Sequence, residues 1–452
     1  MTESSPDRST RLLLLTLGLG VFAGALDLGV LSPALPALAS AFGVVTGDLA
    51  WIFTLYLLVN IAAIAIVSTL ADRYGRRRLY MLSIGIFTLG SAVTILAPSY
   101  GFFLLGRAIQ AFGAGGLFPV ATAAIGDVVP PSRRGAALGL IAATWGLAAV
   151  IGPVLGGALT HFLSWQWIFA ANFPLAAIVL TLARRYVPAR APRARGPLDV
   201  AGLALLCFGL LALADGILSA RVLMVAAGIS LLGGFFLRER MTSNPVVPLS
   251  LFTSNQLAKT YALEISIGIL EGSLFFIPTI IVATQHLNAA IAGLIATLGA
   301  ATFVIVIPFS GRALDRVGSR DVLLAGTALT EIGLAIFALG FGSVALTLIA
   351  MIVAGMGFGA LLGAPTRYIV INETGPSVRA TAVGLLSQCL IIGQIIGTAL
   401  AGGIIGSVRN EIEGYRFAYL AFCAVALLAL VIASTLRGRG DERGAPLEEA
   451  AP

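Results

Sequence analysis

The segment STLADRYGRRR, residues 68–78, follows a long apolar run, and a related segment occurs a second time in the chain. The second copy, GRALDRVGSRD at residues 311–321, lies at an offset of 243 residues. Another pair, PPSRRGAALG at residues 130–139 and GPSVRATAVG at residues 375–384, repeats at an offset of 245. Similar segments at nearly the same offset indicate a duplicated structural unit. The sequence therefore predicts two halves of similar architecture.

The composition excludes an ordinary soluble protein. Of the 452 residues, 58% are hydrophobic and only 11% are charged, whereas a soluble domain carries about a quarter charged residues. The apolar residues form blocks of about 20 residues, the length that a helix needs to cross a bilayer. The 53 glycines fit this class, since small residues let membrane helices approach closely. We predict an all-α integral membrane protein.

Fourteen membrane-spanning helices are expected, twelve in two parallel six-helix bundles and two inserted between them. The first block carries Asp27 and is too long for a signal peptide, so we interpret it as a retained span. The expected spans are 11–38, 48–71, 79–97, 102–128, 135–160, 165–187, 198–218, 222–237, 256–284, 289–310, 322–341, 344–371, 379–406 and 416–436. The expected units are residues 1–187, 188–250 with a linker and the inserted spans, 251–436, and a tail at 437–452.

The positions of the basic residues predict the orientation. With a cytoplasmic N-terminus, all but four of the 28 Lys and Arg lie toward the cytoplasm; Arg221, Arg409 and Arg416 lie outside and Arg107 lies within a span. This is the positive-inside pattern. It predicts a multi-pass protein of the cytoplasmic (inner) membrane with both termini cytoplasmic. The net charge of +7 then reflects topology beside anionic lipids and indicates no nucleic-acid partner.

The charged loop after span two is a candidate gate. Gly75 permits a tight turn, and Asp72 can form charge-assisted bonds with arginines at neighbouring helix ends. Such paired charges form a latch that can break and re-form; the alternative is a solvated charge run. The candidate gating residues of both halves are Asp72, Arg73, Gly75, Arg76, Asp127, Asp315 and Arg316.

Charged side chains within the spans are the candidate site. Carboxylates at this depth are expensive and mark sites by default. The candidates for proton coupling and substrate binding are Asp27, Arg107, Glu264 and Glu271, with Glu331 ranked below them. Asp27 and Arg107 have similar predicted depths, so an ion pair that breaks on protonation is a hypothesis. His161 and His286 are expected near outer loops, and the three cysteines give neither disulfide nor metal spacing.

Several motifs carry a resemblance to the major facilitator superfamily, specifically its fourteen-spanner drug:proton antiporters. The loop at 68–78 resembles the family's cytoplasmic signature, although Ser68 stands where the family has Gly. Span four, with Arg107, Gln110, Gly113 and Gly115, resembles the Arg-containing motif. Span five resembles the antiporter motif through Gly146, Gly152, Pro153, Gly156 and Gly157. Leu26-Asp27 with Pro33 and Pro36, and Trp165 to Phe169 with Asn172, resemble the first-span and sixth-span motifs.

This resemblance implies a monomeric proton-driven exporter of small amphipathic compounds, cationic or neutral, which needs no cofactor beyond the proton gradient. It also implies a cavity lined by spans one, four, nine and twelve. Aromatic residues that can stack with such compounds are Phe22, Trp51, Phe112, Phe118, Phe275 and Phe276. The alternatives are an importer or exporter of a specific metabolite or lipid, a membrane enzyme, and a sensor that has lost transport. The sparse histidines and the absence of a nucleotide-binding loop speak against an enzyme.

Overall fold

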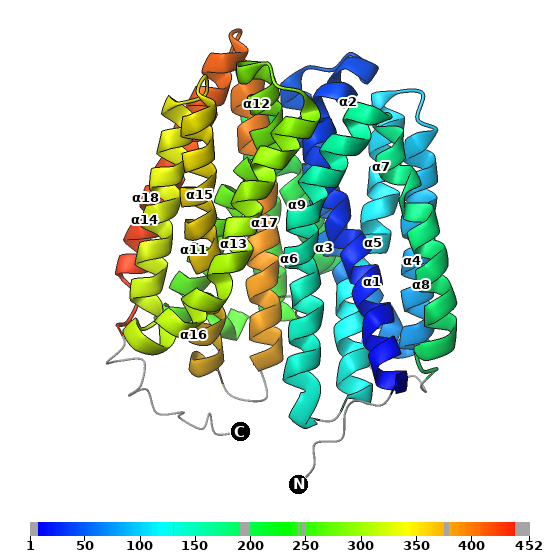
Figure 1. Ribbon diagram of the computed structural model, residues 1–452. Helices are drawn as coiled ribbons and strands as arrows, with labels where there is room; N and C mark the ends of the chain where they lie inside the picture. The colour runs from blue at the N-terminus through cyan, green and yellow to red at the C-terminus, as the bar shows by residue number, and fades with distance from the viewer. Residues whose placement is uncertain are drawn as a thin grey trace.

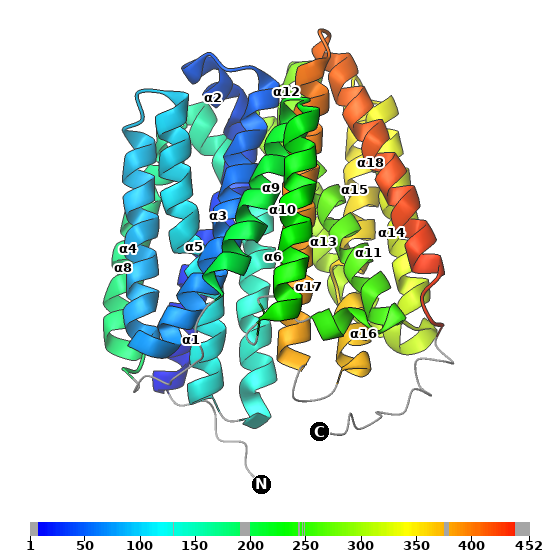
Figure 2. The same cartoon turned by 180° about the vertical axis from the view of Figure 1, so that it is seen from behind.

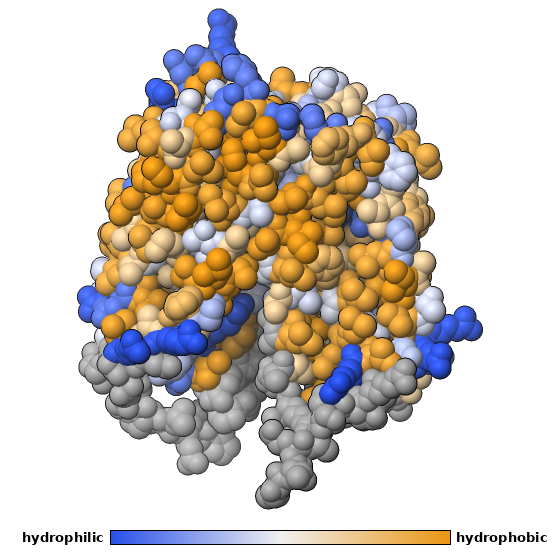
Figure 3. Space-filling view, viewed as in Figure 1, coloured by the Kyte–Doolittle hydropathy of each residue, from blue (hydrophilic) through white to orange (hydrophobic). Residues whose placement is uncertain are grey.

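The computed structural model describes residues 8–129, 131–189, 199–242, 245, 247, 249–374 and 379–438. Fourteen helical segments within this part of the chain are long and apolar enough to cross a membrane, which confirms the expected count. The first extends over Thr10–Phe42 and the last over Glu411–Ser434. Apolar side chains dominate the middle of the face in Figure 3, and the most hydrophilic ones gather toward its two ends. The predicted linker residues 190–198 and tail residues 439–452 lie outside the described residues.

The first half contains six spans. Ser32–Ala34 and Thr46–Leu49 are short 3-10 helices, η1 and η2. The α-helices are α1 (Arg8–Leu31), α2 (Leu35–Phe42), α3 (Ala50–Tyr74), α4 (Arg76–Ile95), α5 (Tyr100–Val128), α6 (Pro131–Phe162), α7 (Gln166–Ala170) and α8 (Asn172–Tyr186).

The second half repeats this plan. Leu249–Phe252 and Ser273–Phe276 are the 3-10 helices η3 and η4. The α-helices are α11 (Asn255–Gly272), α12 (Ile277–Gln285), α13 (Ala289–Val317), α14 (Ser319–Leu339), α15 (Val344–Leu361), α16 (Pro365–Glu373), α17 (Arg379–Ser407) and α18 (Glu411–Ser434). Figure 1 shows the two halves side by side, with both chain ends at the same end of the molecule.

The first span of each half breaks at a corresponding place. The α1 helix ends before η1, where Pro33 removes a backbone donor, and α11 ends before η4, which is followed by Pro278. The two breaks meet, because the Ser32 hydroxyl donates a hydrogen bond to the Phe275 carbonyl oxygen. The repeat in sequence therefore corresponds to a repeat in helix geometry.

Two helix pairs join the halves. The α6 helix packs on α13, and α3 packs on α17. In the second pair the Thr54 and Thr398 hydroxyl oxygens are 2.8 Å apart, and Thr46 donates to Glu411 near the end of the molecule opposite the termini. Among the described residues, the hydrogen bonds between the halves lie in the part of the molecule away from the termini. The halves are thus closed against each other at that end.

The inserted helices α9 (Val200–Leu218) and α10 (Val222–Met241) form a hairpin on the face seen in Figure 2. The α9 helix packs on α17 and α3, and α10 packs on α9. Asp199 caps α9 by accepting a hydrogen bond from the Gly202 amide at 3.0 Å. This bond, together with the Arg238 guanidinium, lowers the pKa of Asp199 below its usual value. The contact between Asp199 and Arg238 therefore holds the start of α9 to the end of α10.

The α6 helix packs closely on α1 because glycines lie at the contact. A Cβ atom at Gly156 would lie 1.9 Å from the Val30 carbonyl oxygen, which belongs to backbone and cannot swing away. A Cβ atom at Gly152 would lie 2.9 Å from backbone atoms of Gly29. Glycine at these positions sets the distance between the two helices.

We predict that Gly156→Ala lowers the thermal unfolding midpoint of the purified protein in detergent, because α6 must move away from α1. Overpacking of this kind typically costs about 1–3 kcal/mol. Gly85→Ala is the matched control, since nothing lies within 4 Å of a Cβ atom there. The control should unfold at the wild-type temperature or slightly above, because Ala is favoured over Gly in a helix by about 0.5–1 kcal/mol. Equal effects of both substitutions would contradict the packing argument.

Candidate functional site

Asp27 and Arg107 form an ion pair inside the first half. An Asp27 carboxylate oxygen accepts a hydrogen bond from Nη1 of Arg107, so the structure brings together the two residues that the sequence placed at similar depth. The Asp27 residue is 1% exposed and Arg107 is 0% exposed. Removing two charges from water is unfavourable unless they are paired and hydrogen-bonded. The pair therefore needs the partners that surround it.

Amide and hydroxyl groups complete the pair into a network. Gln110 donates to the other Asp27 oxygen at 2.8 Å and accepts from Arg107 at 2.6 Å. The Gln110 amide also donates to Ser91 at 2.9 Å, and Asn172 donates to the same hydroxyl at 3.0 Å. These residues come from α1, α4, α5 and α8, so the network ties together four helices.

Aromatic rings flank the guanidinium group of Arg107. The Tyr56 ring centre lies 4.3 Å from its central carbon, and the Phe169 ring centre lies 6.0 Å from it. A cation over a ring face is stabilised by the ring quadrupole, more strongly where water is absent. Within the described part of the chain, Nε and Nη2 of Arg107 have no hydrogen-bond partner.

The burial of Asp27 and Arg107 differs from the expectation that residues on spans one and four line a cavity. The pair is linked through Gln110 to Ser91 of α4, and Asn172 of α8 donates to the same hydroxyl, all within the first half. Span counting assigns a residue to a helix and a depth, and it leaves open which side of the helix the residue occupies. Asp27 and Arg107 are therefore buried inside the first bundle in this structure.

The carboxylates of the second half have different surroundings. Glu271, at the end of α11, is partly buried and accepts a hydrogen bond from the Gln394 amide of α17 at 2.9 Å. Glu264 is 5% exposed, lies near Thr366 and Arg367 of α16, and has one oxygen without a partner among the described residues. Structure and sequence agree that Glu331 is apart from these groups.

Glu331 lies on α14 beside Cys423 of α18, away from α11 and α17.

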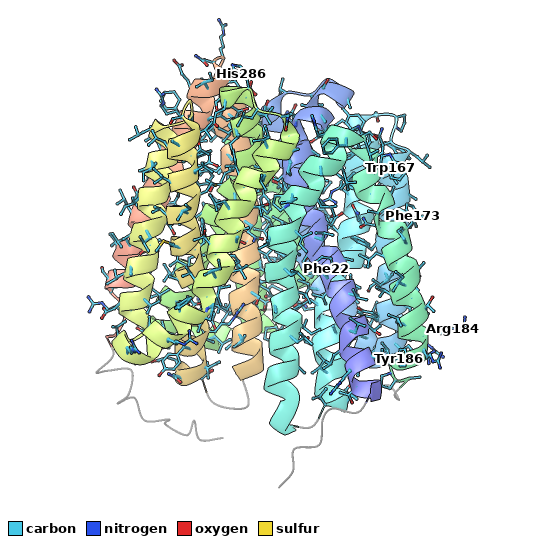
Figure 4. All side chains as sticks on the ribbon, viewed as in Figure 1. Phe22, Trp167, Phe173, Arg184, Tyr186 and His286 are labelled. Atoms are coloured by element: carbon cyan, nitrogen blue, oxygen red, sulfur yellow. The ribbon has the colours of Figure 1, made fainter. Side chains whose placement is uncertain are left out.

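His161 and His286, which the sequence places near outer loops, are both exposed. In Figure 4, His286 lies at the end of the molecule opposite the chain ends. Asp215, in the last turn of α9, pairs with Arg221 of the hairpin turn at 3.5 Å.

Among its described side chains, the candidate gate contains the ion pair between Arg76 and Asp127. Arg76, at the start of α4, pairs with Asp127 near the end of α5, and the neighbouring Arg77 donates to the Arg184 carbonyl oxygen at the end of α8. The side chains of Asp72 and Asp315 lie outside the described part of the structure. Arg73 and Arg316 are exposed.

Gly75 and Gly318 make the corresponding turns in the two halves. Both have φ = 93°, a value that residues with a side chain rarely adopt. The turn that the sequence predicts at Gly75 is therefore present, and the repeat preserves it at Gly318. Each turn joins the second and third spans of its half.

The glycines of the candidate antiporter motif place α6 between two helices. Gly152 and Gly156 face α1, whereas a Cβ atom at Gly157 would lie 2.6 Å from the Ala289 carbonyl oxygen of α13. Gly146 faces Val304 of α13, and Pro153 lies inside α6 with its carbonyl oxygen close to Gly293. The motif is thus at the junction between the halves as well as within the first one.

The proposed aromatic contacts separate into inner and peripheral sets. Phe275 stacks on Phe53 of α3 with ring centres 4.4 Å apart, and Phe276 is fully buried. Phe118 is 40% exposed. Figure 4 places Phe22 near the middle of α1.

Sequence reasoning missed several members of the site. It did not assign Ser91, Tyr56 or Gln394 to the network, and it used Asn172 only as a motif residue. Polar amides within apolar spans are a usable signal for Gln394 and Asn172, because such groups need partners in the membrane. Ser91 and Tyr56 carry no such signal, since serine and tyrosine are common in spans.

A bundle of fourteen apolar helices in two repeated halves, with charges buried between helices, defines a multi-pass membrane transporter. The family model for the Major Facilitator Superfamily matches residues 17–270 and 262–451. The chain belongs to this superfamily, and it is a transporter of a small molecule rather than an enzyme.

Relatives and solved structures agree with this class. "Uncharacterized MFS-type transporter YfiU" of Bacillus subtilis is 31% identical, with 87% of this chain and 79% of the relative covered. "Multidrug resistance protein B homolog" of Mycobacterium tuberculosis is 29% identical, with 97% and 83% covered. The crystal structure of a bacterial homolog of the human lysosomal transporter Spinster, inward-facing and unoccupied, has a TM-score of 0.69 at 17% identity, covering 95% of this chain and 97% of that chain. The last comparison supports the fold alone.

We predict that Asp27→Asn lowers the thermal midpoint strongly, because it leaves the Arg107 charge buried without a counter-ion. Breaking a buried pair from one side costs about 3–5 kcal/mol. The double variant Asp27→Asn with Arg107→Gln should recover much of the loss, as measured by thermal unfolding in detergent. Asp215→Asn is the control, since its partner Arg221 has a 62% exposed side chain and exposed pairs contribute about 0–1 kcal/mol. A double variant no more stable than Asp27→Asn would argue against a net electrostatic penalty.

Proposed function

We propose that this transporter is a proton-coupled exporter of small amphipathic compounds, cationic or neutral. The observation that carries the proposal is the buried Asp27–Arg107 pair within the polar network of the first half. A carboxylate paired with a single arginine in the membrane has two arrangements. It is either charged and paired, or protonated and separated from an arginine that takes another partner.

Proton uptake by Asp27 would change the packing of four helices. Protonation cancels the carboxylate charge, so Nη1 of Arg107 loses its counter-ion while Gln110 remains between them. Because Gln110, Ser91 and Asn172 link α5, α4 and α8, a shift at Arg107 is transmitted to these helices. A bistable element of this kind can bias one half against the other.

Glu271 is suited to contact the cargo. Its side chain is partly exposed, it has a neutral amide partner in Gln394, and it lies next to η4, where Phe275 stacks on Phe53 of the other half. A carboxylate beside aromatic rings favours a cation with apolar surface. Glu264, which is more buried, would then tune the electrostatics of the same helix.

The charged loop motif and the glycine motif of α6 would serve the rocking of the halves. The Arg76–Asp127 pair joins the ends of α4 and α5 near the termini, and it can break when these ends separate. The glycines of α6 allow close packing on both α1 and α13, so one helix can slide against helices of both halves. Export rather than import is supported by relatives whose names include "Multidrug resistance protein".

The proposal includes an orientation and a location. The chain would lie in the cytoplasmic membrane as a monomer with both termini in the cytoplasm and with lipids around its apolar belt. The positions of the arginines support this, since basic residues gather at the end that carries the termini. The proton gradient would supply the energy, without a cofactor.

The test is proton release from purified, detergent-solubilised protein when cationic and neutral amphipaths are added. The wild type should release protons on binding, measured with a pH dye in weakly buffered solution. Asp27→Asn should reduce the release with little change in ligand affinity, because Asp27 is remote from the cargo. Glu271→Gln should weaken binding of cations more than of neutral compounds. Glu331→Gln, on the peripheral helix α14, is the control and should behave as the wild type.

Binding of amphipaths without proton release by the wild type would overturn the antiport mechanism. Release that persists unchanged in Asp27→Asn would remove Asp27 from the coupling. Equal loss of cationic and neutral binding in Glu271→Gln would argue that Glu271 supports the helix rather than the cargo.

A further inference from the structure

Five aromatic rings form a contiguous cluster in the first half, at the end opposite the termini. Phe103 of α5 is its centre, with its ring 5.4 Å from Phe42, 5.8 Å from Trp165, 5.8 Å from Phe169 and 6.4 Å from Tyr100. Phe103 is 0% exposed. The rings come from α2, from α5, and from α7 with the residue before it.

The cluster lies directly beside the buried ion pair. Phe103 precedes Arg107 by four residues on α5, which places it one helical turn closer to the end opposite the termini. Phe169 belongs to the cluster and also lies 6.0 Å from the Arg107 guanidinium carbon. Only seven residues, a rise of about 10 Å, separate Arg107 from Tyr100 at the beginning of α5.

The rings offer no path for a proton. Protons move along chains of water and hydrogen-bonding groups, and close-packed rings exclude water. The Tyr100 hydroxyl donates to the carbonyl oxygen of Asp48, in η2, at 2.7 Å. On the other side of the rings, Nε and Nη2 of Arg107 have no partner among the described residues, so water that reached them would gain hydrogen bonds.

We infer that these five residues, Phe42, Tyr100, Phe103, Trp165 and Phe169, form an aromatic cap that keeps external water from the Asp27–Arg107 pair. Phe103 is the positioning residue at its centre. The inference rests on the proposed proton coupling at Asp27. An exporter that uses a proton gradient must prevent protons from crossing without cargo, and this cluster lies between Arg107, the partner of Asp27, and the end of α5 opposite the termini. The cap would make proton entry depend on a change in helix packing.

The second half provides a matched control. Phe337, Phe341, Tyr419 and Phe422 form a second ring cluster, in which Phe337 is 1% exposed and lies 4.9 Å from Tyr419. Within the described part of the chain, no arginine lies over a ring of this second cluster. Opening it should therefore disturb packing to a similar degree without exposing an ion pair.

The experiment measures passive proton flux in liposomes that contain the purified protein, with a pH step, an enclosed pH dye, valinomycin with potassium to clamp the voltage, and no cargo. Phe103→Ser creates space and adds a hydroxyl group that can hold water, so we expect a several-fold increase in flux over wild type. Phe337→Ser should remain at the wild-type rate. Phe103→Leu should also stay near wild type, because it fills most of the space without polar atoms. If Phe103→Ser does not fold, Phe103→Ala is measured in its place.

A second substitution tests the route. Adding Asp27→Asn to Phe103→Ser should return the flux to the wild-type rate, because the carboxylate is the relay. Flux that persists in the double variant, or that rises equally in Phe337→Ser, would show a nonspecific proton leak. Either outcome would contradict the inference of an aromatic cap. An unchanged flux in Phe103→Ser would overturn it as well. These outcomes are separate from the proposed coupling, which stands or fails on cargo-induced proton release by the wild-type protein.

Discussion

Much of the first half is arranged around the buried ion pair between Asp27 and Arg107. Two charges without exposed surface require partners on every side, because neither water nor lipid can solvate them there. Gln110, Ser91 and Asn172 supply hydrogen bonds, and Tyr56 and Phe169 supply ring faces. The positions of α1, α3, α4, α5, α7 and α8 relative to one another are thus linked to one electrostatic requirement.

The two halves share one arrangement of helices but differ in their buried charged residues. The first half encloses a paired charge, whereas the second presents Glu271 beside the break in its first span, next to the other half. Both halves keep the turn glycines Gly75 and Gly318 and the broken first span. The duplication therefore preserved the elements that shape the fold, while the buried charges diverged. Under the proposed mechanism, one half would take up the proton and the other would contact the cargo.

Backbone contacts decide how closely the halves and their helices meet. Gly156 lies against Val30 within the first half, and Gly157 lies against Ala289 across the junction. Neither position has room for a methyl group without movement of backbone. Because hydrophobic burial gives little preference between helices in lipid, packing of this kind and interhelical hydrogen bonds hold the bundle together. The Thr54–Thr398 contact is one such bond between the halves.

The sequence by itself determined the class, the fourteen spans, the repeat and the residues of the buried pair, because hydropathy, helix length and charge are local properties that a bilayer enforces. It also identified Gly75 as a turn. Only the tertiary structure decided that Gln110 links the Asp27–Arg107 pair to α4, and that Ser91, Tyr56 and Gln394 belong to the polar sites. It also decided that Phe103 contacts four other rings. The reason is that the rotation of a helix about its axis depends on all its neighbours, and neither depth nor composition specifies it.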